Sequence, residues 1–342
     1  MKRDPIQVAT SATPATVGLA RSRGNGNVSQ PIAPSPSARR PRPARAPADP
    51  LGAPAYRTSL GAMYQGDSVA LMSRMPAASV NLAVTSPPYA LHFKKEYGNV
   101  DKSAYVEWFR PFAEQIYRVL TDDGSFVLNI GGSYNAGSPT RSLYHFRLLI
   151  MLCDEIGFHL AQECFWYNPA KLPTPAEWVN VRRIRIKDSV EYVWWFSKSP
   201  FPKANNRRVL TEYSADMRRL IERGYRAKER PSGHKITAKF QVNHGGSIPS
   251  NVIERGNNES NSEYIRRCAQ SGLKAHPARF PAALPEFFIK LLTDEGDRVL
   301  DPFAGSNTTG AVAEALNRRW TGLELEPRYV ENSKLRFPEV NP

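Results

Sequence analysis

Short apolar runs alternate along this chain with longer stretches of helical periodicity, and this alternation restricts it to few folds. A continuous apolar run of a few residues is typical of a strand that is buried on both faces of a parallel sheet. Between these runs, apolar residues recur at helical spacing, as in Tyr105, Phe109 and Phe112. The pattern predicts an α/β fold with a doubly wound, mostly parallel sheet. The predicted strands include Val80–Val84, Ser125–Ile130, Leu160–Trp166, Arg298–Leu300 and Trp320–Glu324.

A loop with the sequence Thr85-Ser86-Pro87-Pro88-Tyr89 follows the first of these strands. Open α/β sheets bind their ligands at the carboxyl ends of strands. The two prolines fix the backbone and hold Ser86 extended, so the Ser86 hydroxyl and the Pro87 carbonyl lie beside an aromatic ring. Such a loop can accept hydrogen bonds from the amino group of a flat ring and stack on that ring. Taken alone, the same five residues also suit an ordinary proline-rich turn.

A second loop, with the sequence DPFAGSNTTG, begins at Asp301 and opens a helix. An acid, small residues at a helix N-terminus and a second acid, Glu324, at the end of the next strand are typical of a site for an adenosine-containing cofactor. Gly305 lets the ligand approach the backbone, and Glu324 can accept both ribose hydroxyls. The loop matches neither GxGxxG nor the GK[ST] of a P-loop. A dinucleotide is therefore less favoured, and hydrolysis of a nucleoside triphosphate has no support.

The net charge of +14 is concentrated in two segments. Residues 1–56 carry 8 Lys and Arg against 2 Asp and Glu, and residues 205–275 carry 14 against 7, so the rest of the chain is nearly neutral. This distribution predicts a polyanion as partner. Residues 1–56 also contain ten prolines and no apolar periodicity, which predicts a disordered leader.

Candidate contacts to such a polyanion lie in two places. Arg183, Arg185 and Lys187 alternate with isoleucines, which predicts a strand with one basic face; a solvated strand face is the alternative. His234 and His244 lie among Asn, Ser and Gly residues in segment 205–275, where base-edge and phosphate contacts are expected.

Several classes of site and location are not indicated. No apolar run approaches the roughly 18–20 residues needed to span a bilayer. Cys153, Cys164 and Cys268 are isolated, so neither a disulfide framework nor a zinc site is expected, and we predict no metal. A reducing bacterial cytoplasm is the expected compartment.

The two loops together resemble those of the S-adenosylmethionine-dependent amino-group DNA methyltransferases. TSPPY is similar to the form associated with N4-cytosine enzymes, whereas adenine enzymes usually have an acid in place of Ser86. The catalytic motif precedes the cofactor loop with a recognition region between them, as in the β-type permutation of that family. Further stretches resemble the PvuII-type modification methyltransferases over roughly residues 60–337, among them GGSYNAGSPTRSLYHFR, NPAKLPTPAEWVN and KAHPARFPAALPEFFI.

This resemblance implies S-adenosyl-L-methionine as cofactor and a cytosine that is flipped out of duplex DNA as substrate. The target-base residues that it implies are Ser86, Pro87, Pro88, Tyr89 and Asn129, where Asn129 stands in place of an expected Asp and cannot take a proton. The implied cofactor-binding residues are Asp67 near the adenine, Glu324 on the ribose, and Asp301, Phe303, Gly305, Ser306, Asn307 and Thr308 toward the methionine end.

The implied organisation is a leader at 1–56, a catalytic part at 57–204, a target-recognition region at 205–275, a cofactor part at 276–337 and a tail at 338–342. The resemblance also implies a monomer, a CAGCTG site with its inner cytosine modified, and a cognate restriction endonuclease that shares the site without a stable complex. An N6-adenine methyltransferase on the same scaffold and a non-catalytic DNA-binding protein that keeps the cofactor fold are the alternatives.

Overall fold

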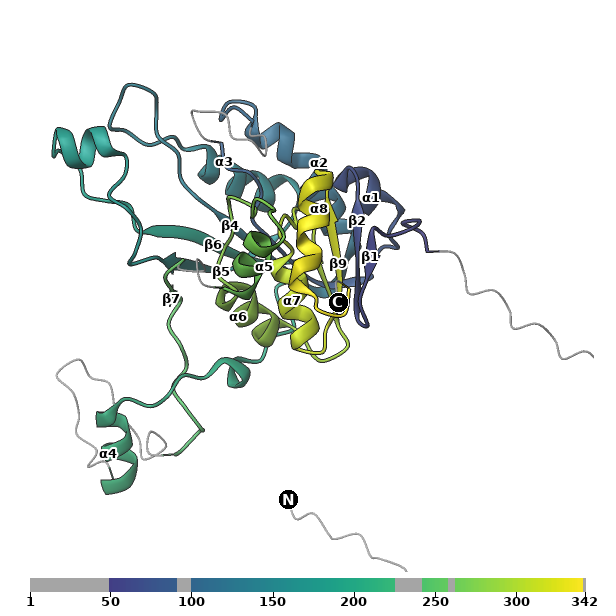
Figure 1. Cartoon of the computed structure of the whole chain (residues 1–342). Helices are drawn as coiled ribbons and strands as arrows, with labels where there is room; N and C mark the ends of the chain where they lie inside the picture. The colour runs from purple at the N-terminus through teal and green to yellow at the C-terminus, as the bar shows by residue number, and fades with distance from the viewer. Residues whose placement is uncertain (1–48, 91–99, 225–241, 258–261, 341–342) are drawn as a thin grey trace, which may run out of the picture. The chain divides into compact units, whose positions relative to one another are not determined.

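The computed structural model describes residues 49–90, 100–224, 242–257 and 262–340, all of them in the compact unit that spans residues 48–342 (Figure 1). Within these ranges the strands form one sheet in the order β1-β2-β9-β8-β3-β4-β6-β5-β7. The strands are β1 (Tyr56–Arg57), β2 (Gly61–Gln65), β3 (Val80–Thr85), β4 (Leu120–Ile130), β5 (His159–Tyr167), β6 (Val190–Ser197), β7 (Val252–Glu254), β8 (Arg298–Asp301) and β9 (Arg319–Glu324).

Strands β2, β9, β8, β3 and β4 run parallel to one another and form the centre of the sheet. Strand β6 pairs antiparallel with both β4 and β5, β1 pairs antiparallel with β2, and β7 lies parallel to β5 at the far edge. The predicted α/β class with a mostly parallel sheet is therefore confirmed.

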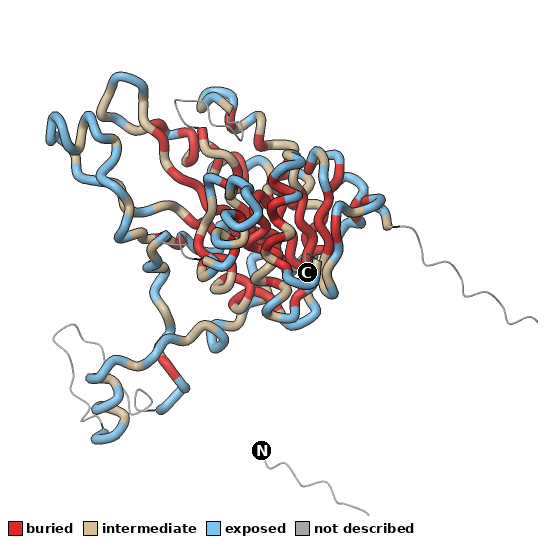
Figure 2. The backbone as a smooth tube through the Cα atoms, viewed as in Figure 1, coloured by how far each residue is buried: buried red, intermediate tan, exposed pale blue. Residues whose placement is uncertain are grey.

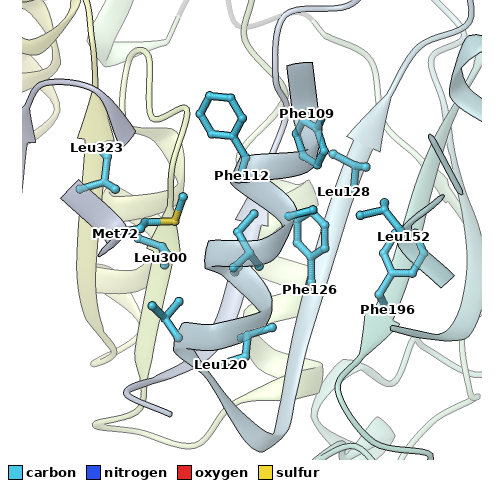
Figure 3. Packing of buried hydrophobic residues seen from close by; sticks show 14 of the residues in the cluster. Met72, Phe109, Phe112, Leu120, Phe126, Leu128, Leu152, Phe196, Leu300 and Leu323 are labelled. Carbon is cyan, nitrogen blue, oxygen red and sulfur yellow. The ribbon is translucent and has the colours of Figure 1, made fainter. Parts of the chain in front are cut away.

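Helices cover both faces of this sheet, because successive residues of a buried strand point to opposite sides. In β4, Phe126 and Leu128 pack with helices on one face (Figure 3). Val127, between them, packs in the cluster on the other face. The buried residues concentrate in the sheet and its flanking helices (Figure 2). The first face carries α1 (Ser68–Arg74), α2 (Tyr105–Val119) and α3 (Tyr144–Ile150); the second carries α6 (Ala283–Leu292), α7 (Thr308–Ala315) and α8 (Pro327–Ser333).

The basic strand expected around residues 183–187 is not a strand, and this prediction was wrong. Strand β6 begins only at Val190, and Arg183 has a left-handed backbone with φ of 55°. Arg185 folds back, donating from Nη1 to the Pro139 carbonyl and stacking its guanidinium on the ring of Tyr134. The alternating isoleucines are exposed, so they have no apolar layer to pack against and nothing fixes an extended conformation.

The segment 205–275 contains elements that its weak periodicity did not predict. They are helices α4 (Ala215–Arg223) and α5 (Glu263–Gln270) together with strand β7. Strand β7 extends the central sheet, and α5 buries Tyr264 and Cys268 against Leu335 near the C-terminus. Parts of this segment are thus built into the α/β unit. Among the described helices, none is both long and apolar enough to cross a membrane.

Candidate active site

A cavity of about 690 Å³ lies where the two loops predicted from the sequence meet. Strands β3 and β8 are parallel neighbours, so the loops that follow them emerge side by side. From β3 the chain leads to β4 on one side, and from β8 it leads to β9 on the other, which makes this a topological switch point where open α/β sheets bind ligands. The predicted residues that line the cavity are Asp67, Ser86, Pro87, Pro88, Tyr89, Asn129, Asp301, Phe303, Gly305, Ser306, Thr308 and Glu324.

Asp301 connects the loop that begins with it, the cofactor loop, to the neighbouring strand β3 by a hydrogen bond. Its Oδ1 accepts a hydrogen bond from the Thr85 hydroxyl at 2.7 Å and one from the Phe303 amide at 3.1 Å. Its Oδ2 accepts from the Thr309 hydroxyl at 2.6 Å. Burial raises the pKa of Asp301 from 3.8 to about 6, although these bonds oppose that shift. Because both oxygens are already engaged, Asp301 holds the shape of the loop.

Glu324 braces the same loop from the end of β9. Its Oε2 accepts from the Gly305 amide at 2.8 Å, and its Oε1 accepts from the Glu326 amide at 2.9 Å. Burial raises its pKa. Gly305 has φ of +52°, and a Cβ at this position would lie 3.2 Å from Nε2 of His276. A larger residue at this position would be strained by the positive φ and would press on His276, so glycine is the residue that fits.

Asn307 does not line the cavity, unlike the other residues assigned to the cofactor. It is the N-cap of α7 in a left-handed conformation, where its Oδ1 accepts from the Gly310 amide at 3.0 Å. Its Nδ2 donates to the Tyr56 hydroxyl at 3.0 Å. The side chain thus shapes the turn into the helix from behind the loop.

The loop at residues 85–89, called the base loop below, presents its polar groups to the other part of the cavity. The Ser86 hydroxyl lies 3.2 Å from the Tyr89 hydroxyl, which donates to Oε2 of Glu191 at 2.8 Å. The Pro88 carbonyl is occupied by the Tyr105 hydroxyl at 2.8 Å. The Tyr89 ring packs on Gly131, where a Cβ would come within 2.6 Å of a ring carbon. Burial holds the pKa of Tyr89 well above its usual value, so the phenol stays a hydrogen-bond donor.

Asn129 adds a buried acceptor to the same wall of the cavity. Its Nδ2 donates to the Tyr192 carbonyl at 3.2 Å, whereas its Oδ1 has no hydrogen-bond partner among the described residues. A buried acceptor without a partner costs about 1–3 kcal/mol. This arrangement suits a ligand that brings an N–H group to Asn129.

Comparison with known proteins identifies the kind of protein that carries this site. The sequence profile of a family described as DNA methylase, of N6 and N4 methyltransferases, matches residues 80–335. The chain belongs to this DNA methylase family.

Its relatives agree in length as well as in sequence. The methylase is 52% identical over 291 residues to the type II methyltransferase M.PvuII from Proteus hauseri, covering 84% of this chain and 87% of that protein. It is 28% identical over 289 residues to M.ScaI from Streptomyces caespitosus, covering 82% of each. The solved structure of the PvuII DNA methyltransferase (cytosine-N4-specific) superposes with a TM-score of 0.68 at 47% identity, covering 83% of this chain and 88% of that one. The resemblance to amino-group DNA methyltransferases is confirmed.

Several residues of the methylase's cavity were not predicted as functional. Glu191, Trp166 and His276 also line it. Glu191 is the one charged residue in the otherwise apolar run of β6, a signal that the sequence offered. Burial lowers the pKa of His276 to about 4, and its Nδ1 lies 2.5 Å from the carbonyl oxygen of Ala278, so the ring is held by the backbone of its own loop.

The described residues that were assigned to DNA contacts do not line the cavity. Lys187 donates from Nζ to the carbonyls of Pro169 and Lys171, and Arg183 is exposed. The backbone amide of His244 donates to the Tyr213 hydroxyl. Their contacts with DNA stay predictions, and His234 lies outside the described residues. Within the described ranges, no group of three His, Cys, Asp or Glu side chains is placed to hold a metal ion.

Proposed function

We propose that this methylase transfers a methyl group from S-adenosyl-L-methionine to the N4 amino group of a cytosine in duplex DNA. The observation that carries the proposal is a single cavity in which acceptors for an amino group, Ser86 Oγ and Asn129 Oδ1, share space with the loop braced by Asp301 and Glu324. The cytosine-N4 specificity of the similar PvuII DNA methyltransferase supports N4 of cytosine. Ser86 supports it too, because adenine enzymes of this family usually have an acid there.

The residues around the cofactor loop fit S-adenosyl-L-methionine. When bound, this cofactor supplies an electrophilic methyl group on a positively charged sulfur. Glu324 uses one lone pair of each oxygen on the backbone, so the second pair of each can accept a ribose hydroxyl. Gly305 leaves room beside the backbone. Asp67, whose carboxylate caps α1, lines the same cavity and is assigned to the adenine.

The base loop can hold a cytosine that has left the DNA stack. An amine inside the duplex cannot face the methyl donor, so the base has to be extruded. We assign Ser86 Oγ, Asn129 Oδ1 and the Pro87 carbonyl as the three candidate acceptors for the two N4 hydrogens, and the Tyr89 ring as the stacking surface. Accepting both hydrogens favours a pyramidal nitrogen whose lone pair is free to attack. Orientation of this kind supplies a large part of the acceleration in group transfer.

The finer assignments rest on the resemblance to the PvuII-type enzymes and on the distribution of charge. We propose CAGCTG as the recognition site, with the inner cytosine modified and the site shared with a cognate restriction endonuclease in a bacterial cytoplasm. The protein acts as a monomer. The recognition region is 205–275, between a catalytic part at 57–204 and a cofactor part at 276–337. The candidate DNA contacts are Arg183, Arg185 and Lys187 in the catalytic part and His234 and His244 in the recognition region. N6-methylation of adenine is the alternative reaction.

Methyl transfer to two duplexes tests the proposal. One duplex carries CAGCTG and the other carries the same bases in a different order, with labelled S-adenosyl-L-methionine as donor. We expect transfer to the first only. Ser86→Ala should lower turnover at least about 100-fold, the effect of removing one group that stabilises a transition state, and should leave cofactor affinity unchanged. Ser73→Ala, at an exposed serine of α1, is the control. Turnover by Ser86→Ala at the wild-type rate would exclude the assigned role.

A further inference from the structure

A chain of hydrogen bonds leads from the base loop to the ion pair of Glu191 and Lys171, which has no role in the reaction as proposed above. Ser86 Oγ lies 3.2 Å from the Tyr89 hydroxyl, and this hydroxyl lies 2.8 Å from Oε2 of Glu191. The other carboxylate oxygen of Glu191 pairs with Nζ of Lys171 at 2.9 Å. Glu191 is the second residue of β6, lines the cavity, and has a side chain that is only 17% exposed.

The direction of each bond follows from the number of hydrogens available. An ionised carboxylate can only accept, and a phenol has a single hydrogen to donate. The hydrogen of Tyr89 therefore goes to Glu191, and the Tyr89 oxygen accepts the hydrogen of Ser86. The Ser86 oxygen is then left with its lone pairs toward the cavity. Through Tyr89, Glu191 makes Ser86 an acceptor, which is the role that binding an amino group requires.

The same chain can carry a proton away from that amino group. Asn129 cannot take a proton, and Asp301 already accepts three hydrogen bonds from Thr85, Phe303 and Thr309. Among the acids that line the described cavity, Glu191 is the one joined to Ser86 by hydrogen bonds through a single residue, Tyr89. The ammonium group of Lys171 holds its carboxylate in place.

We propose that Glu191 is a positioning residue for Ser86 and the final acceptor of the proton that the amine loses; this rests on the function proposed above. The N4 lone pair forms the new N–C bond, the electrons of the S–C bond stay on sulfur, and the nitrogen becomes cationic. One N4 proton then moves to Ser86 Oγ as the Ser86 proton moves to Tyr89 and the Tyr89 proton moves to Glu191. The methylated amine and the Glu191 carboxyl are both neutral at the end.

Three variants test this relay: Glu191→Gln, Tyr89→Phe and the double variant. The first keeps the shape of the side chain without its charge, and the second keeps the stacking ring without its hydroxyl. Asp297→Asn is a matched control, because Asp297 pairs with Lys203 at 2.7 Å, is also 17% exposed, and does not line the cavity. For each protein we would measure the single-turnover rate of methyl transfer, the cofactor dissociation constant, and the affinity for duplex DNA with S-adenosylhomocysteine present.

We expect Glu191→Gln and Tyr89→Phe each to lower the single-turnover rate at least tenfold. Because both changes interrupt one chain, the double variant should be no slower than the slower single variant. Cofactor and DNA affinities should stay within about twofold, and Asp297→Asn should keep the wild-type rate. A wild-type rate in Glu191→Gln, or losses that multiply in the double variant, would overturn the relay. A wild-type product other than N4-methylcytosine would overturn the proposed function, while the ratios between variants would still decide the relay on whichever amine is methylated.

Discussion

Replacing Asp301 by Asn should change how the stability of the protein depends on pH. Burial raises the pKa of this carboxyl from 3.8 to about 6, so the folded protein holds the proton more tightly than the unfolded chain does. The resulting contribution to stability is complete below pH 3.8 and is lost as the pH rises through 6. A shift of this size corresponds to about 3 kcal/mol. Asparagine can keep hydrogen bonds to Thr85 and Thr309 but has no proton to lose in this range.

The measurement is urea unfolding of the cofactor-free wild type and of Asp301→Asn between pH 4 and pH 7.5. Burial lowers the pKa of His145 and of His276 to about 4, so both act in the opposite direction over this range. Because both proteins contain these two histidines, their effect cancels in the difference between the two free energies of unfolding. We expect the free energy of unfolding of the variant relative to the wild type to rise by about 2 kcal/mol between pH 4 and pH 6.5 and then to level off. A difference that does not vary with pH would refute the reasoning.

Three further substitutions have measurable consequences. Gly305→Ala should lower the free energy of unfolding in urea more than Gly137→Ala does. Both positions have positive φ, which costs a residue with a side chain about 1–2 kcal/mol, but only the Cβ at position 305 would also lie near another residue, His276. Equal losses in the two variants would contradict this. Glu324→Gln should weaken cofactor binding at least tenfold by calorimetry, since bonds to a charged group contribute about 1.5–3 kcal/mol; wild-type affinity would exclude its assignment to the ribose. The lowered pKa of His145 makes its protonation costly in the folded state, so the wild type should lose about 2 kcal/mol of stability from this residue as the pH falls from 6.5 to 5. His145→Leu should not show this loss. The same dependence of stability on pH in both proteins would show that His145 is not its source.

The centre of the sheet could be predicted because its strands are buried on both faces. Short runs rich in Val and Leu, such as those at 80–84 and 298–300, are typical of buried strands, and the structure has β3 and β8 there. The expected strand around Arg183 failed because apolar residues that alternate with basic ones fit an exposed loop equally well. Only a neighbouring strand would have decided between them, and the sequence pattern does not reveal neighbours.

The two loops of the site could be predicted because each has local chemistry that needs special residues, prolines in one and Gly305 in the other. Asn307 was assigned to the cofactor by its place in the motif, yet its left-handed cap conformation directs its amide to Tyr56. The position of Glu191 depends on pairing between β5 and β6 and on a contact with Tyr89 across 102 residues of sequence. Contacts of this kind are set by the tertiary fold.

The most direct measurement is nucleoside analysis of duplex DNA after incubation with the wild-type protein and methyl-labelled S-adenosyl-L-methionine. The cavity walls formed by Ser86, Asn129 and Tyr89 predict that the label is recovered as N4-methylcytosine. Label recovered as N6-methyladenine, or no transfer by protein that still binds the cofactor, would contradict the proposed reaction.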